Sequence, residues 1–159
     1  MMGNITQILF VCHGNICRSP MAEFVMKDLL QKAGCNDDFL VSSVAVSTEE
    51  IGNDIYPPAK KKLCEKNIPF ATRRARQISR EDFRASDYVI LMDKSNYRLL
   101  RYIVGEDVLD REVGKVSMLM EWAGENRDVA DPWYTGDFEK AYQDILKGCQ
   151  AFLKKIMKE

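Results

Sequence analysis

A cysteine and an arginine that could together bind a phosphate group lie near the start of the chain. Cys12 and Arg18 are separated by five residues and follow a short apolar run. A turn of this length between a strand and a helix can direct its main-chain N–H groups at an oxyanion, and the helix N-terminus adds partial positive charge. Arg18 supplies a planar fork for two phosphate oxygens. We therefore expect phosphate to be bound by His13, Gly14, Asn15, Ile16, Cys17 and Arg18.

The field that binds a phosphate dianion should also stabilise a thiolate at Cys12, which would then act as a nucleophile without a histidine base. His13 is the only histidine of the chain, so no second imidazole is available for that role. Gly14 permits main-chain angles that a Cβ atom would resist. Two roles stay open at this point. Asn15 either braces the loop in a left-handed conformation or is an ordinary turn residue, and Ser19 either donates a hydrogen bond to the sulfur or caps a helix.

Alternating strand and helix patterns predict the framework that would position this loop. Residues 5–11 form a nearly continuous apolar run, typical of a strand buried on both faces of a parallel sheet. Pro20 fits the first turn of a following helix, and Gly34 fits its end. We expect further strands over residues 39–46, 87–92 and 116–120, and helices over residues 56–66, 95–104 and 138–156. The fold class is therefore α/β, with a doubly wound, four-stranded parallel sheet flanked by helices in a flavodoxin-like three-layer sandwich.

The composition fits one globular domain over residues 1–159. Hydrophobic residues make up 46% and charged residues 30%, which excludes a disordered chain. Lys and Arg number 23 against 24 Asp and Glu, so we expect no nucleic-acid partner. No apolar run approaches the roughly 20 residues that span a bilayer, so we expect no membrane partner. Five cysteines without an export signal argue against a disulfide framework and for a cytoplasmic protein, and neither a metal nor another cofactor is expected.

The cysteine loop resembles the signature of the low-molecular-weight protein tyrosine phosphatases, in the form Val11-Cys12-His13-Gly14-Asn15-Ile16-Cys17-Arg18-Ser19-Pro20. Further segments follow in family order over nearly the whole chain, at residues 47–53, 75–77, 92–96 and 131–138. The resemblance implies a phosphoric monoester hydrolase that acts through a cysteinyl-phosphate intermediate. It implies phosphotyrosine proteins or small aryl phosphates as substrates, with inorganic phosphate and vanadate as competing oxyanions.

Such a reaction needs a general acid for the leaving oxygen, and the resemblance selects Asp131 for this role. From the residues alone, a turn-initiating Asp-Pro pair is the favoured interpretation of Asp131 and Pro132. Trp133 and Tyr134 follow directly and are interpreted as walls of the substrate cleft. The resemblance also makes Tyr134 a possible site of regulatory phosphorylation.

The resemblance implies supporting and redox roles for two more residues. Ser43 corresponds to a serine that hydrogen-bonds Asn15, although an exposed strand serine is the alternative. Cys17 could trap an oxidised Cys12 as a reversible disulfide, and the alternative is a small buried apolar residue.

Three positions depart from the family pattern. Arg73 stands where many members carry a histidine that supports the loop, so loop rigidity is expected to rest on other hydrogen bonds. Glu49 replaces an aromatic wall of eukaryotic members, and His13 replaces a commonly apolar residue. We therefore expect a more polar cleft, although Glu49 can also be read as a solvated surface charge.

Two other functions remain as alternatives. An arsenate reductase shares this fold and loop, but it needs two further cysteines on a mobile segment, and residues 80–93 contain none. A binding module that holds phosphate or a phosphoprotein without turnover would not need a nucleophile, an arginine and an acid together. An assay for vanadate-sensitive release of an aryl phosphate separates a phosphatase from such a module.

Overall fold

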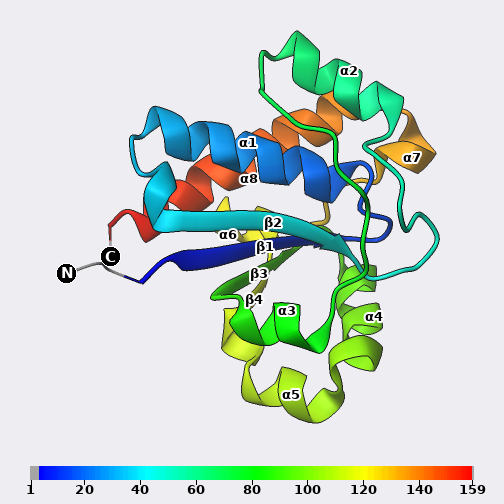
Figure 1. Cartoon of the computed structure of the whole chain (residues 1–159), viewed down its shortest axis with the longest axis vertical. Helices are drawn as coiled ribbons and strands as arrows, with labels where there is room; N and C mark the ends of the chain where they lie inside the picture. Colours follow the sequence, from blue (N-terminus) through cyan, green and yellow to red (C-terminus); the bar gives the residue numbers. More distant parts are fainter. Residues whose placement is uncertain (1–3, 159) are drawn as a thin grey trace.

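The computed structural model describes residues 4–158. In this part of the chain, four parallel strands form one sheet in the order β2-β1-β3-β4 (Figure 1). The strands are β1 (Thr6–Cys12), β2 (Phe39–Ala45), β3 (Tyr88–Leu91) and β4 (Val116–Met118). The register places Cys12 opposite Ala45 and Val11 opposite Leu91. The carboxyl ends of β1, β2 and β3 therefore meet at one edge of the sheet, which is where open α/β sheets bind ligands.

Helices cover both faces of the sheet, so the predicted α/β fold class is confirmed (Figure 1). One face carries α1 (Arg18–Lys32) and α8 (Phe138–Ile156), and the other carries α3 (Arg80–Ala85), α4 (Lys94–Val104) and α5 (Glu106–Arg111). The remaining elements are α2 (Pro57–Glu65), α6 (Leu119–Trp122), α7 (Pro132–Thr135) and the 3-10 helices η1 (Asn36–Asp38) and η2 (Val113–Lys115). No helix within residues 4–158 is long and apolar enough to cross a membrane.

Strand β1 is buried on both faces and separates two apolar clusters. Ile8 and Phe10 belong to the cluster beneath α1 and α8, whereas Leu9 and Val11 belong to the cluster beneath α3, α4 and α5. Because successive side chains of a strand point to opposite faces, the continuous apolar run of β1 contributes to both cores. Full burial of each such side chain contributes about 1.5–3 kcal/mol, so β1 is firmly held and its last residue, Cys12, has a fixed position.

The sequence prediction placed one boundary wrongly and missed several short helices. The strand expected over residues 116–120 ends at Met118, because Leu119 and Met120 turn inward and begin α6. Leu119 packs so closely on α8 that a Cβ atom at Gly148 would lie 2.5 Å from its Cγ. Helices α3, α5, α6 and α7 span only four to six residues, which is too short for a helical period to show in the sequence.

Candidate active site

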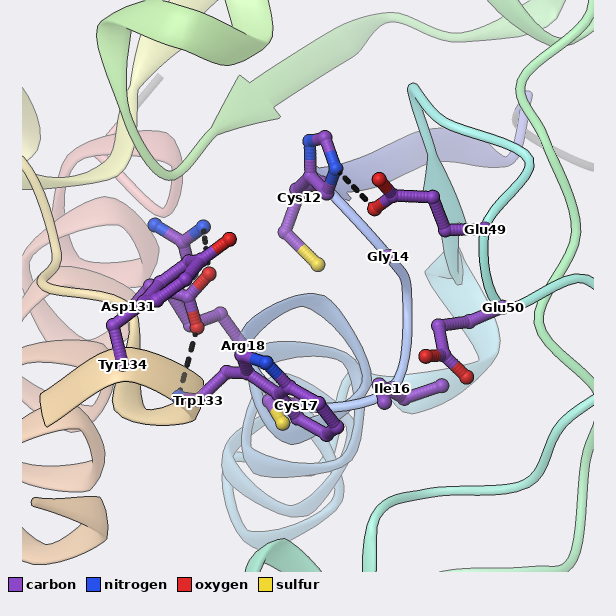
Figure 2. A pocket seen from close by; sticks show the side chains of 11 residues that line it. Cys12, Gly14, Ile16, Cys17, Arg18, Glu49, Glu50, Asp131, Trp133 and Tyr134 are labelled. Carbon is purple, nitrogen blue, oxygen red and sulfur yellow. Dashed lines mark hydrogen bonds and ion pairs between the residues drawn. The ribbon is translucent and has the colours of Figure 1, made fainter. Parts of the chain in front are cut away.

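Cys12 ends β1, and its sulfur faces a cavity of about 240 Å³ (Figure 2). The residue is only 3% exposed. The main-chain N–H of Asn15 donates to Sγ over 3.2 Å, and Oγ of Ser19 lies 2.9 Å from the same sulfur. The sulfur is therefore held among hydrogen-bond donors at the base of the cavity, an arrangement that favours negative charge on it.

The loop that follows Cys12 presents its main-chain amides to the same cavity. Within residues 4–158, the N–H groups of Gly14, Ile16 and Cys17 have no hydrogen-bond acceptor, although all three residues line the cavity. Helix α1 begins immediately afterwards, and its N-cap residue Cys17 provides no side-chain cap. Unpaired amides at the N-terminus of a 15-residue helix can bind an oxyanion. We call residues 12–18 the phosphate loop.

Asn15 holds the phosphate loop in shape from behind. Its φ of 60° lies in the left-handed region, as one of the two sequence interpretations expected. Its buried Nδ2 donates to Oγ of Ser19 over 2.8 Å and to Oγ of Ser43 over 3.0 Å. Ser19 accepts from Asn15, and its own proton can point at the Cys12 sulfur, 2.9 Å away, or at the carbonyl oxygen of Val44, 3.4 Å away. Ser19 lies inside α1 and is not the N-cap residue, so the alternative capping role is wrong.

Ser43 lies on β2 behind the phosphate loop and outside the cavity. It donates to Oε1 of Glu23 over 2.6 Å, so the chain of hydrogen bonds continues from Asn15 into helix α1. Sequence reasoning missed Glu23. Its signal in the sequence is a charged residue between the apolar Ala22 and Phe24, in a part of α1 where an unpaired carboxylate would be costly to bury.

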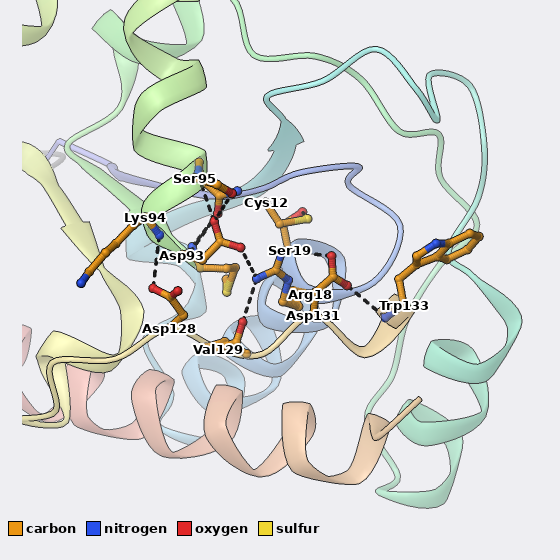
Figure 3. Close-up of polar contacts among 12 residues, drawn as sticks. Cys12, Arg18, Ser19, Asp93, Lys94, Ser95, Asp128, Val129, Asp131 and Trp133 are labelled. Carbon is orange, nitrogen blue, oxygen red and sulfur yellow. Dashed lines mark hydrogen bonds and ion pairs between the residues drawn. The ribbon is translucent and has the colours of Figure 1, made fainter. Parts of the chain in front are cut away.

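Arg18 is the most deeply buried charge of the site, at 2% exposure of its side chain. Its Nη1 donates to Oδ2 of Asp93 and to the carbonyl oxygen of Val129, each over 2.7 Å, and Nη2 lies 3.3 Å from Oδ2 of Asp131 (Figure 3). Burial opposes the charge, but the negative Cys12 sulfur, Asp93 and Asp131 outweigh it and raise the pKa of Arg18. The guanidinium is therefore charged, and its Nε and Nη2 atoms keep donors available for an anion.

Asp93 is a partner of Arg18 that sequence reasoning missed. It is the N-cap residue of α4, where it accepts from the N–H of Asn96 over 3.0 Å, and Oδ1 of Asn96 accepts from its N–H in return. Burial alone would raise the pKa of this carboxyl, but the charge of Arg18 and hydrogen bonds from Ser95 and Arg18 lower it below its usual range. The available signal was an Asp-x-x-Asn capping box at the end of β3, beside the end of β1.

Asp131 faces the cavity from the opposite wall (Figure 2). It is the N-cap residue of α7, its Oδ1 accepts from the N–H of Trp133 over 3.0 Å, and 22% of its side chain is exposed. Trp133 is 50% exposed and packs on Tyr56 with ring centroids 4.7 Å apart, while Tyr134 is 82% exposed. Both aromatic residues line the cavity.

The third wall of the cavity is polar. Nε2 of His13 lies 2.6 Å from Oε2 of Glu49, and both residues line the cavity together with Glu50 (Figure 2). Two of the three departures noted in the sequence therefore form one hydrogen-bonded pair, and Glu49 lines the cavity while 68% of its side chain stays exposed. Glu50 is fixed by Nδ2 of Asn53, which donates over 2.6 Å, and sequence reasoning did not identify it.

Cys17 lines the same cavity as Cys12, and both thiols are free. Burial, followed by the negative charges of Cys12 and Asp131, raises the pKa of Cys17 well above its usual range. Cys17 therefore stays a neutral thiol. Within residues 4–158, no group of His, Cys, Asp or Glu side chains is arranged to hold a metal ion.

The fold and the site define an α/β protein with a thiol inside an anion-binding loop, faced by a buried guanidinium and a carboxyl group. The family model of the low molecular weight phosphotyrosine protein phosphatases matches residues 7–159. The chain belongs to this family, whose members are phosphoric monoester hydrolases.

Individual members of the family are similar to this chain over nearly its full length. The low molecular weight protein-tyrosine-phosphatase YfkJ of Bacillus subtilis is 37% identical over 96% of each chain. The human low molecular weight phosphotyrosine protein phosphatase is 38% identical over 93% of this chain and 94% of its own. The crystal structure of YfkJ superposes with a TM-score of 0.92 over 99% of this chain and 98% of that one.

We predict that Asp93→Asn lowers the free energy of unfolding by about 1–3 kcal/mol at pH 7, because the buried Arg18 loses its charged partner. Since the pKa of Asp93 is lowered in the folded protein, its stabilising contribution is complete above the unfolded value, about 4, and is lost as the pH falls through the folded value. The difference between the two proteins in urea denaturation should therefore shrink below pH 4. Asp110→Asn, at an exposed residue of α5, is the control, and an equal loss there would contradict the prediction.

Proposed function

We propose that residues 1–159 form one catalytic domain in which Cys12, Arg18 and Asp131 hydrolyse phosphotyrosine and other aryl phosphate monoesters. The observation that supports these roles is their meeting in a single cavity, with the Cys12 sulfur under the Asn15 N–H and the Ser19 hydroxyl. Free thiols, including the nucleophile, suit the reducing cytoplasm.

In the first step, the Cys12 thiolate attacks phosphorus, and the bond from phosphorus to the aryl oxygen breaks. Arg18 binds two of the phosphoryl oxygens through Nε and Nη2, and the loop amides bind the rest. The contact from Nη2 to Asp131 is long, at 3.3 Å, so a phosphate dianion can replace Asp131 there. The released Oδ2 then carries the proton that Asp131 donates to the leaving oxygen.

In the second step, water hydrolyses the cysteinyl phosphate. Asp131, now a carboxylate, takes a proton from the water, whose oxygen bonds to phosphorus as the bond from sulfur to phosphorus breaks. Cys12 departs as a thiolate, which the Ser19 hydroxyl and the Asn15 N–H stabilise from 2.9 and 3.2 Å. One carboxyl group thus serves as acid and then as base.

The walls of the cavity determine which leaving groups fit. The exposed Trp133 and Tyr134 would sandwich an aryl ring, whereas the pair of His13 and Glu49 offers polar contacts on the other side. We propose phosphotyrosine proteins or small aryl phosphates as substrates, and inorganic phosphate and vanadate as oxyanions that compete for the phosphate loop.

We predict that Cys12→Ser lowers kcat by more than about 10³-fold while inorganic phosphate still binds, because the loop amides and Arg18 remain in place. Release of phenol from phenyl phosphate measures turnover, and titration calorimetry measures phosphate binding. Cys64→Ser, at an exposed residue of α2, is the control and should keep full activity. Substantial turnover by Cys12→Ser would rule out nucleophilic catalysis by this residue.

We predict that Asp131→Asn lowers kcat for the hydrolysis of phenyl phosphate by about 10²–10⁴-fold, the usual contribution of a general acid. For an aryl phosphate whose phenol is strongly acidic, kcat should fall much less, because the leaving oxygen needs no proton. The comparison of kcat for the two substrates is its own control. Equal losses for both would assign the acid to another residue.

We propose that Cys17 protects an oxidised Cys12. Peroxide converts the Cys12 thiolate to a sulfenic acid and releases hydroxide, after which the Cys17 thiol displaces water and forms a disulfide. The raised pKa of Cys17 makes this second step slow near neutral pH, and it should accelerate as the pH rises towards that value.

We predict that peroxide-treated wild-type protein recovers activity when a dithiol is added, whereas Cys17→Ser loses activity irreversibly. Peptide mapping should find Cys12 linked to Cys17 in the wild type. Cys35→Ser, at a buried cysteine far from the cavity lining, should behave as the wild type does. Equal recovery by Cys17→Ser would contradict the protective role.

A further inference from the structure

A second cavity, of about 380 Å³, lies at the carboxyl ends of β3 and β4. Helix α4 forms one wall, β4 and α6 form another, and residues 126–128 form the third. Within residues 4–158, no residue lines both this cavity and the one that contains Cys12. Its volume falls in the range of small-molecule sites, roughly 300–1,000 Å³, and it lies at the ligand-binding edge of an α/β sheet. We call it the α4–β4 cavity.

Apolar side chains give the α4–β4 cavity a surface for a hydrophobic group. Leu91 at the end of β3 is fully buried, and Val116 and Met118 of β4 are half-buried. Tyr97 of α4 is also half-buried and adds an aromatic ring. Because burial of apolar area drives association, an aliphatic or aromatic group would pack here. The flexible Met118 can adapt to the shape of such a group.

Two cations of α4 line the α4–β4 cavity without a partner. Lys94 and Arg98 are four residues apart and therefore share one face of the helix. Within residues 4–158, neither side chain makes a hydrogen bond or an ion pair. Figure 3 shows the Lys94 side chain pointing away from Asp128, although the Lys94 N–H donates to Oδ1 of Asp128 over 3.2 Å. Arg127 also lines the cavity, but its Nη1 and Nη2 are occupied by Asp144, over 2.9 and 2.8 Å.

Two carboxylates line the same cavity from the other walls. Glu121 of α6 has no side-chain partner within residues 4–158, and in that range the Asp128 carboxylate accepts only the Lys94 N–H. Neither carboxylate forms an ion pair with Lys94 or Arg98, so charges of both signs face one space without meeting. A ligand that carries both charges complements these walls, whereas a ligand with one charge is repelled by one of them.

We propose that the α4–β4 cavity is a second ligand site, which takes a small zwitterion of the amino-acid class with an aromatic or large aliphatic side chain. Lys94 and Arg98 bind its carboxylate, and Glu121 and Asp128 bind its ammonium group. Its side chain packs on the apolar residues of β3 and β4. A dianion such as phosphate does not suit this cavity, because the two carboxylates face it. The proposal is independent of the proposed phosphatase function, since none of its residues lines the cavity of Cys12.

The first test titrates the ¹⁵N-labelled full-length protein with L-phenylalanine and follows its amide signals by NMR. We expect a dissociation constant below about 10 mM, with shifts at residues 94–98, 116–118 and 126–128. Two analogues are titrated in the same way. The analogue 3-phenylpropionate lacks the ammonium group, and 2-phenylethylamine lacks the carboxylate. Each should bind about three- to tenfold more weakly than L-phenylalanine, because each leaves one pair of charges without its ligand group.

The second test separates the two sets of charges by substitution. Arg98→Gln should weaken L-phenylalanine and 3-phenylpropionate by about three- to tenfold and leave 2-phenylethylamine unchanged. Glu121→Gln should weaken L-phenylalanine and 2-phenylethylamine and leave 3-phenylpropionate unchanged. Arg111→Gln and Glu81→Gln are the matched controls, because both residues are exposed and lie outside the cavity lining. Neither control should change any of the three affinities by more than about twofold.

The proposal is overturned if L-phenylalanine shifts no amide around the α4–β4 cavity up to about 10 mM, or shifts only amides of the phosphate loop. It is also overturned if either analogue binds as tightly as L-phenylalanine, or if Arg98→Gln binds all three ligands as Arg111→Gln does. Thermal unfolding checks that each variant is folded. The comparison of the three ligands on the wild type needs no variant, so it decides the matter if a substitution prevents folding. No measurement here uses turnover, so loss of the proposed phosphatase function would leave this result unaffected.

Discussion

A guanidinium buried at the end of a parallel sheet is the constraint on which this site depends. Arg18 gives up most of its hydration, so the fold must supply partners, and it does so with Asp93, Val129 and Asp131. Asp93 follows the carboxyl end of β3, and Val129 and Asp131 lie in the segment before α7. Arg18 therefore ties together three connections that are distant in sequence, and the cavity forms where they meet (Figure 3).

The two carboxylates that contact Arg18 are held differently, and this separates their functions. Asp93 is locked into the capping box of α4 and contacts Arg18 over 2.7 Å, so it is a fixed structural partner. Asp131 contacts Arg18 over 3.3 Å, is more exposed and caps a helix of only four residues. The weaker contact is the one that an incoming phosphate can replace. A site with two equally tight carboxylates would neutralise Arg18 and repel the substrate dianion.

The sequence predicted the sheet, the main helices and the loop well because each has a strong local signal. The apolar run of β1 indicated a doubly buried strand, and the resemblance selected Asp131 where the residues alone could not. Glu23, Asp93 and the hydrogen bonds that Arg73 donates to Asn15 were missed because they depend on which strand ends become neighbours. Asp93 lies 75 residues from Arg18 along the chain, and Arg73 lies 58 from Asn15. No local period encodes such a contact.

A negatively charged Cys12 sulfur and a phosphate group are both stabilised by hydrogen-bond donors and positive charge. This shared requirement explains why the loop is supported from the side away from the cavity. The N–H of Asn15 reaches the sulfur because φ at that residue is positive, and the Nδ2 of Asn15 holds the Ser19 hydroxyl 2.9 Å from the same sulfur. Both contacts with the sulfur therefore depend on Asn15. A loop with free amides in front cannot stabilise itself, because every internal hydrogen bond would remove a donor from the anion. Its rigidity must therefore come from the side away from the cavity, which is where Ser43, Glu23 and Arg73 lie.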